Sequence, residues 1–242
     1  MHIRDFEFEL KKRVDFIKDI VKKTNTSGII FGNSGGKDCV LVGILCKKAC
    51  DNTVSVIMPA GTAQNIGSDR TDALLIAEKY DIKTRIVDIE YVKDKLVQQI
   101  IISTAITDNS IANIAPRLRM TVLYTIAASE NRLVAGTGNR SERYMGYFTK
   151  HGDGAFDFNP ISDLTATEVL DFLRWLDAPR SIINKEPSAG LYEGQTDELE
   201  MGISYKAIDE YLLTGNVTES DLAIINRFHN ATNHKRVPPP TL

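Results

Sequence analysis

An apolar run followed at once by a glycine turn decides the fold: Ile29-Ile30-Phe31-Gly32-Asn33-Ser34-Gly35-Gly36-Lys37-Asp38-Cys39. The first three residues predict a buried strand, and the run from Asp38 to Ala49 predicts the helix that follows it. At such a helix start, free backbone N–H groups can hold phosphate. Asp38 would repel phosphate unless a cation such as Mg²⁺ bridged the two groups. The alternative is a plain tight turn in which the helix dipole favours Asp38.

Strand and helix patterns alternate along most of the chain. Apolar runs predict further strands at 53–58, 84–88 and 133–135, and helical periodicity is found at 6–21, 69–80, 91–103 and 118–129. This alternation predicts an α/β fold, with a twisted parallel sheet and helices on both faces. Because a second glycine turn, 136–138, follows the last strand, both turns should face one crevice beyond the carboxyl ends of the strands.

The C-terminal third is helical, with two long connecting segments. Thr165 and Glu168 form a capping-box pattern that begins a helix through Trp175, and further helices are expected at 205–213 and 219–230. The segments 148–159 and 184–202 are rich in glycine and charged residues, which predicts movable surface loops or lids. Neither an internal repeat nor a linker interrupts the sequence, so we expect residues 1–242 to form a single domain.

Composition restricts the possible functions. A net charge of −3 and 43% hydrophobic residues indicate a globular protein whose overall field does not attract nucleic acid or an anionic membrane. No apolar run is long enough to cross a bilayer, and the N-terminus lacks the pattern of a signal peptide, so a cytoplasmic location is expected. The three cysteines, Cys39, Cys46 and Cys50, are expected to be reduced thiols.

Neither glycine turn follows a standard nucleotide-binding code. The first is not a Walker A loop, because Asp38 follows Lys37 and Phe31 stands where the first glycine belongs. The second is not a dinucleotide fingerprint, because Ser141 stands where the last small residue belongs. Any phosphate site must therefore be of another kind.

The first turn resembles the pyrophosphate loop of the N-type ATP pyrophosphatases, whose fold is of the adenine nucleotide alpha hydrolase type. Within that group the chain resembles the ammonia-dependent NAD synthetases over nearly its whole length. The matching stretches are 113–120, 136–142, 146–150, 152–154, 157–160, 186–189 and 202–205.

The resemblance assigns roles to individual residues. It implies that Asp38 and Glu142 bind Mg²⁺, and that these two and Lys150 are catalytic. The implied ATP-binding residues are Gly32, Asn33, Ser34, Gly35, Gly36, Lys37, Asp38, Cys39, Thr137 and Ser188. The implied residues for the second substrate, deamido-NAD (nicotinic acid adenine dinucleotide), are Arg117, Lys150, Asp157, His234 and Lys235. Cations suit a substrate that carries a diphosphate and a carboxylate.

The implied reaction converts deamido-NAD to NAD. The substrate carboxylate attacks the α-phosphorus of ATP, pyrophosphate leaves, and ammonia then displaces AMP from the acyl adenylate. The two lids would exclude water from this reactive intermediate. The chain has no room for a glutamine-hydrolysing domain, so free ammonia or a donor protein is expected to supply nitrogen. The resemblance also implies a homodimer.

Two positions depart from the family pattern. Cys39 replaces the usual loop serine, and the helix N-terminus is expected to lower the pKa of its thiol. Ala166 stands where a lysine usually reaches ATP, with Lys37 and Lys185 as candidates to replace it. Two rival hypotheses remain: another ATP pyrophosphatase that adenylates a different substrate, and a nucleotide-binding module without synthetase activity.

Overall fold

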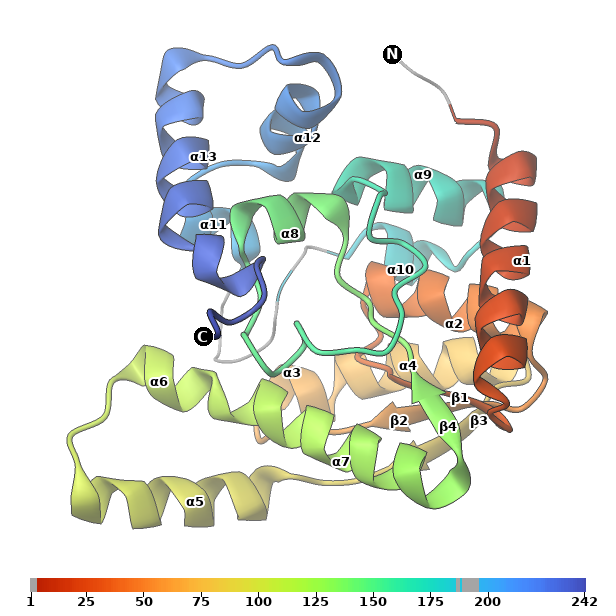
Figure 1. Ribbon diagram of the computed structural model, residues 1–242, viewed down its shortest axis with the longest axis horizontal. Helices are drawn as coiled ribbons and strands as arrows, with labels where there is room; N and C mark the ends of the chain where they lie inside the picture. The colour runs from red at the N-terminus through yellow and green to blue at the C-terminus, as the bar shows by residue number, and fades with distance from the viewer. Residues whose placement is uncertain (1–3, 186–187, 189–195) are drawn as a thin grey trace.

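The computed structural model describes residues 4–185, 188 and 196–242 (Figure 1). Within them, four parallel strands form a sheet in the order β3-β2-β1-β4. Their bounds are Gly28–Gly32 for β1, Thr53–Ile57 for β2, Lys83–Ile86 for β3 and Arg132–Val134 for β4. Ile30 of β1 pairs with Val54 on one side and Val134 on the other. The parallel sheet is confirmed, and each strand ends within two residues of its predicted bounds.

Helices cover both faces of the sheet, because successive side chains of β1 point to opposite sides. Ile29 and Phe31 pack into an apolar cluster with side chains from five helices: α1 (Phe6–Thr24), α2 (Lys37–Ala49), α4 (Ser68–Lys79), α9 (Ala166–Trp175) and α10 (Arg180–Ile183). Ile30 packs on the opposite side against Leu123 of α7 (Ile114–Glu130). The predicted covering of both faces is therefore confirmed.

Helix α5 (Glu90–Ser103) forms where periodicity predicts it, but it lies at the edge of the molecule (Figure 1). None of its residues is buried. The side chains of Tyr91 and Ile102 are 71% and 80% exposed. Several apolar residues of α5 are therefore exposed in the described part of this chain.

The C-terminal helices pack around a third apolar cluster that includes Met145, Ile208 and Ile225. The predicted helices correspond to α9, α12 and α13, and the capping box of Thr165 and Glu168 is present. Short helices not anticipated from periodicity complete the chain. The remaining bounds are α3 Ala63–Ile66, α6 Asp108–Ala112, α8 Arg140–Met145, α10 Arg180–Ile183, α11 Asp197–Met201, α12 Tyr205–Thr214, α13 Glu219–Ala231 and a 3-10 turn at Asn233–Lys235. Among the described residues, every helix is too short or too polar to span a bilayer.

The segment 148–159 is irregular, as predicted, but only part of it lies at the surface, and its mobility remains a prediction. Thr149 and Phe158 are 5% and 4% exposed, and Phe158 forms a bridge with Ala135 beside β4. The N–H of Thr149 donates to Asp153 at 3.0 Å, which closes the glycine-containing turn on itself. The expectation for 184–202 falls largely on residues 186–187 and 189–195, which lie outside the described part of the chain.

Candidate active site

One cavity of about 800 Å³ lies beyond the carboxyl ends of the strands. Its wall includes Ser34 after β1, Pro59 after β2, and Gly136 and Thr137 after β4. Both glycine turns thus face the same crevice, as predicted from the order of strands and helices.

The first turn is held by hydrogen bonds and presents a helix start to the cavity. Gly35 has φ +72°, and a Cβ there would lie 2.5 Å from the carbonyl oxygen of Asp69, so glycine is required. The Asn33 side chain donates to the Ala73 carbonyl and accepts from the Gly35 N–H, both at 3.1 Å. Gly36 caps α2 without a side-chain hydrogen bond. The first N–H groups of α2 are therefore suited to an anion.

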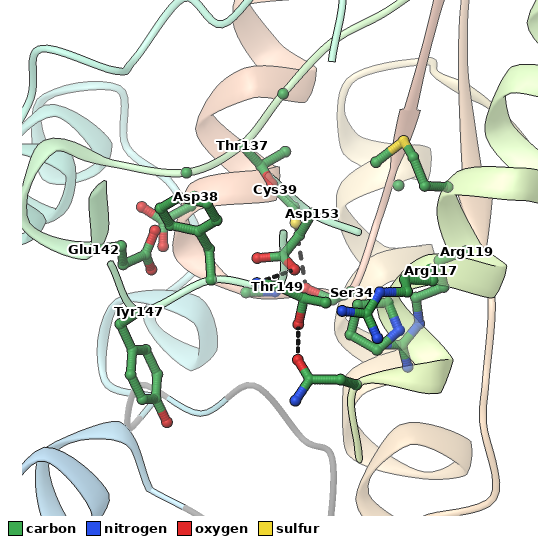
Figure 2. Close-up of a pocket in the computed structure, with 18 of the residues that line it drawn as sticks. Ser34, Asp38, Cys39, Arg117, Arg119, Thr137, Glu142, Tyr147, Thr149 and Asp153 are labelled. Carbon is green, nitrogen blue, oxygen red and sulfur yellow. Dashed lines mark hydrogen bonds between the residues drawn. The ribbon is translucent and has the colours of Figure 1, made fainter. Parts of the chain in front are cut away.

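Asp38 and Glu142 bring their carboxylates together from the two turns (Figure 2). Asn139 connects them: its side-chain amide donates to Asp38 at 3.0 Å, and its side-chain oxygen accepts from the Glu142 N–H at 3.0 Å. Burial, and then the charge of Asp38, raise the pKa of Glu142 well above its usual value. Such a pair attracts a cation.

Lys37 adds an ammonium to this group from the wall of the cavity. Its side chain is only 7% exposed, and Nζ donates to Asp38 at 2.8 Å. It also lies 5.3 Å from the centre of the Tyr205 ring, and the Tyr205 hydroxyl donates to Asp197 at 3.0 Å. Asp197 lines the cavity as well. Within this group, the Lys37 ammonium faces the three carboxylates of Asp38, Glu142 and Asp197. The remaining negative charge is one that a divalent cation would neutralise.

Cys39 points into the cavity beside Ser34 and Thr137 (Figure 2). Its sulfur lies 3.3 Å from the Ser34 hydroxyl. The expectation of a lowered thiol pKa is wrong, because burial raises the pKa of Cys39 and the nearby Asp38 charge adds to the effect.

Four of the five predicted dinucleotide-binding residues line the same cavity: Arg117, Lys150, His234 and Lys235. Lys150 donates to the carbonyl of His234 at 2.9 Å, and Arg117 donates to the carbonyl of Lys150 at 3.3 Å. Lys235 donates to the backbone carbonyls of residues 146 and 148 at 2.8 and 2.7 Å. These contacts gather three cationic side chains from three separate parts of the sequence.

The fifth residue, Asp157, lies outside the wall of this cavity. It is exposed, and it accepts hydrogen bonds from the Val134 N–H at 2.7 Å and the Tyr124 hydroxyl at 3.2 Å. Its predicted contact with the dinucleotide therefore remains a prediction.

The structure also shows the surroundings of Ser188, of Ala166, which departs from the family pattern, and of Lys185. Ser188 lines the cavity, while Ala166 packs with Met145 and Met201 in the apolar cluster. Lys185 lies in the cavity wall but pairs with Asp69 and Asp72, both at 2.8 Å. Of the two candidate replacement lysines, Lys37 is the one that contacts a predicted metal ligand.

Among the cavity-lining residues that the predicted site did not include are Asp197, Arg119 and Asp153. Arg119 lies beside Arg117 (Figure 2), donates to the Met58 carbonyl at 3.1 Å, and has its pKa lowered by burial. Asp153 also lines the cavity and accepts a hydrogen bond from the Thr149 N–H. The matching stretches 113–120 and 152–154 were the available signal for Arg119 and Asp153.

Comparisons with known proteins identify the family. The NAD synthase family profile matches residues 9–239. The chain is 43% identical over 238 residues to the NH(3)-dependent NAD(+) synthetase of Carboxydothermus hydrogenoformans, covering 97% of each chain. It is 42% identical over 210 residues to that of Archaeoglobus fulgidus, covering 86% of this chain and 83% of the other.

Comparisons with solved structures support the same family. The NMN synthetase of Francisella tularensis superposes with a TM-score of 0.93 at 34% identity, covering 99% of each chain. The NH3-dependent NAD synthetase of Campylobacter jejuni, solved with nitrate, gives a TM-score of 0.82 at 31% identity, covering 99% of this chain and 100% of the other. The fold is that of the adenine nucleotide alpha hydrolases. The chain belongs to the NAD synthase family of ligases.

Proposed function

We propose that the chain is an ammonia-dependent NAD synthetase that converts deamido-NAD, ATP and ammonia to NAD, AMP and pyrophosphate. One observation carries the proposal beyond family membership. The same cavity is lined by an anion-binding turn, a carboxylate pair and a gathered set of cations. ATP suits the turn and the carboxylate pair, and a substrate with a diphosphate and a carboxylate suits the cations.

In the first step, a carboxylate oxygen of the substrate bonds to the α-phosphorus of ATP, and the bond to the bridging oxygen breaks with its electron pair on pyrophosphate. The N–H groups at the start of α2 hold the phosphates, and Arg117, Lys150 and Lys235 orient the dinucleotide. Asp38 and Glu142 would hold Mg²⁺, which neutralises phosphate charge when bound. The buried excess of carboxylates supports this metal assignment.

In the second step, ammonia bonds to the carbonyl carbon of the mixed anhydride, AMP leaves, and a proton is lost from nitrogen. The turns 136–138 and 146–154 line the cavity and restrict the access of water. Asp157, His234 and Ser188 complete the set of proposed substrate contacts, with Asp157 acting from outside the cavity described. We propose that residues 1–242 form one domain. We also propose that the enzyme is cytoplasmic, because its three free cysteines stay reduced in that compartment.

A second candidate substrate is the acid mononucleotide that would be amidated to NMN. The observation in its favour is the Francisella tularensis NMN synthetase, which superposes more closely than the Campylobacter jejuni NAD synthetase. Both reactions use the same adenylation chemistry. They differ in whether the cavity must accept a second nucleotide unit.

The test is a single assay of purified protein with ATP, Mg²⁺, ammonium and each acid in separate and competing reactions. We expect equimolar NAD, AMP and pyrophosphate from deamido-NAD, with a higher kcat/KM than for the mononucleotide. Preference for the mononucleotide would establish the second candidate. ATP binding without AMP formation would indicate a binding module, and AMP formation with other carboxylates alone would indicate another ATP pyrophosphatase.

We also propose that the protein is a homodimer that uses α5. Tyr91, Val92, Ile101 and Ile102 on this helix are each more than half exposed. No described part of the chain covers them. In a symmetric dimer, a second copy would bring an identical apolar surface to the same place.

A further inference from the structure

Lys37 has an unusual environment for a lysine. It is the first residue of α2, where the helix end favours anions rather than cations. Its side chain is nevertheless 93% buried, since only 7% is exposed. A buried ammonium at this position carries a cost unless it has partners of opposite charge.

The hydrogen bonds of Lys37 leave part of the ammonium unused. Among the described residues, its one hydrogen-bond acceptor is Asp38, at 2.8 Å, while the Tyr205 ring covers another side at 5.3 Å. An ammonium has three N–H donors, so two remain without an acceptor in the described part of the chain. Because Lys37 lines the cavity beside the first glycine turn, a ligand oxygen there could accept from them.

The Asp38 carboxylate cannot bind the Lys37 ammonium and a divalent cation equally well at the same time. The proposed function gives Asp38 to Mg²⁺ in the ATP complex, and a cation on its carboxylate repels an ammonium bonded to the same group. Lys37 would then need another anion within reach. Bound ATP supplies one, because its phosphates are held by the same turn.

We propose that Lys37 is a catalytic residue that moves from Asp38 to the pyrophosphate half of ATP when the metal and nucleotide bind. This inference rests on the proposed function and deepens it. Without ligand, Lys37 is the internal counter-cation of the carboxylates. With ligand, its freed N–H groups donate to oxygens of the β- and γ-phosphates.

This role is useful because negative charge on pyrophosphate grows as the α,β-bridging bond breaks. An ammonium beside the β-phosphate stabilises that charge as the electron pair moves to the leaving oxygen. The proton stays on Lys37 throughout, and no other reactant is needed.

The experiment compares wild type with Lys37→Met by calorimetry, using magnesium pyrophosphate, Mg-ATP and AMP as separate ligands. We expect binding of pyrophosphate and ATP to weaken on the order of tenfold or more, since a charge-assisted hydrogen bond is lost, while AMP binding is unchanged. Lys47→Met is the matched control. It lies on the same helix but forms a surface ion pair with Asp81 at 3.3 Å, and should bind all three ligands normally.

Lys37→Gln keeps a donor for Asp38 without the charge, and it replaces Lys37→Met if that variant does not fold. Pyrophosphate binding equal to wild type, or an equal loss for AMP and pyrophosphate, would overturn the proposal in favour of a purely structural lysine. A wild-type protein that binds neither ATP nor pyrophosphate would instead contradict the proposed function, and with it the role of Lys37.

Discussion

Asn139 donates a hydrogen bond of 3.0 Å to the carboxylate of Asp38, although the two residues stand 101 positions apart. The same side chain accepts from the Glu142 N–H, and Glu142 accepts from the Asn139 N–H at 2.9 Å. Asn139 is completely buried. It therefore sets the relative position of the two carboxylates and links the two glycine turns.

Asn139→Ala should lower both stability and activity. It removes the N-cap of α8 and leaves Asp38 without one donor, so we expect the melting temperature to fall by about 3–8 °C. AMP formation should fall by about tenfold or more, because the carboxylates lose their alignment. Thr218→Ala is the control, since Thr218 caps α13 away from the cavity. It should lose stability but keep kcat, and an Asn139→Ala enzyme with unchanged kcat would contradict the positioning role.

Asp38→Ala and Glu142→Ala should each nearly abolish AMP formation while the protein still folds. Each removes one of the two carboxylates proposed to hold Mg²⁺, and calorimetry should show weaker Mg²⁺ binding in the presence of ATP. Asp51→Ala, at a fully exposed carboxylate, serves as the control. If both variants fold and turn over at the wild-type rate, the metal assignment is wrong.

In the ligand-free protein, the raised pKa of Glu142 should make the free energy of unfolding depend on pH. Burial and the charge of Asp38 raise the pKa of Glu142 in the folded state, while the unfolded chain ionises near 4.5. The folded state thus holds its proton more tightly, so this contribution to stability is complete below about pH 4.5 and is lost as the pH rises toward the raised pKa. Unfolding of Glu142→Gln and wild type, measured from pH 4 to 8, should show the variant gaining relative stability with pH. A constant difference would contradict this.

Cys39→Ser should keep or raise activity. The serine hydroxyl can replace the sulfur beside Ser34 and is a better donor to phosphate. Wild-type Cys39 should react slowly with alkylating reagents at neutral pH, because burial raises its pKa, and Mg-ATP should slow the reaction further. Cys46→Ser is the contrast: Cys46 lies in the apolar cluster, so a hydroxyl there should cost stability. Alkylation of Cys39 at equal rates with and without Mg-ATP would place its sulfur away from the nucleotide.

A charge on α5 should prevent dimerisation. Ile102→Glu is expected to give a monomer in sedimentation without unfolding the chain, since the residue makes no buried contact within it. Phe8→Glu, at an exposed apolar position on α1, should leave the dimer intact. A dimer broken by Phe8→Glu but not by Ile102→Glu would move the interface to α1.

The sequence by itself determined the local units and the family. Ile29-Ile30-Phe31 and the turn after it required a buried strand and a helix start, because side-chain periodicity and glycine conformations act over a few residues. The order of such units then dictated a parallel sheet and a crevice shared by both turns. Asp38 could be named from its place at a helix start after a glycine turn, and Glu142 from the resemblance to the NAD synthetases.

Only the tertiary structure decided how distant groups meet. Packing of α2 against the second turn places Lys37, Asp38 and Asn139 in one buried cluster, and the loss of solvent there raises the pKa of Cys39 rather than lowering it. Packing also turns Arg119 into the cavity while Asp157 lies outside it. Periodicity predicts that α5 is a helix but not that its apolar side chains stay uncovered. Distances, burial and pKa shifts arise from contacts between residues far apart in the chain, and no local pattern encodes those contacts.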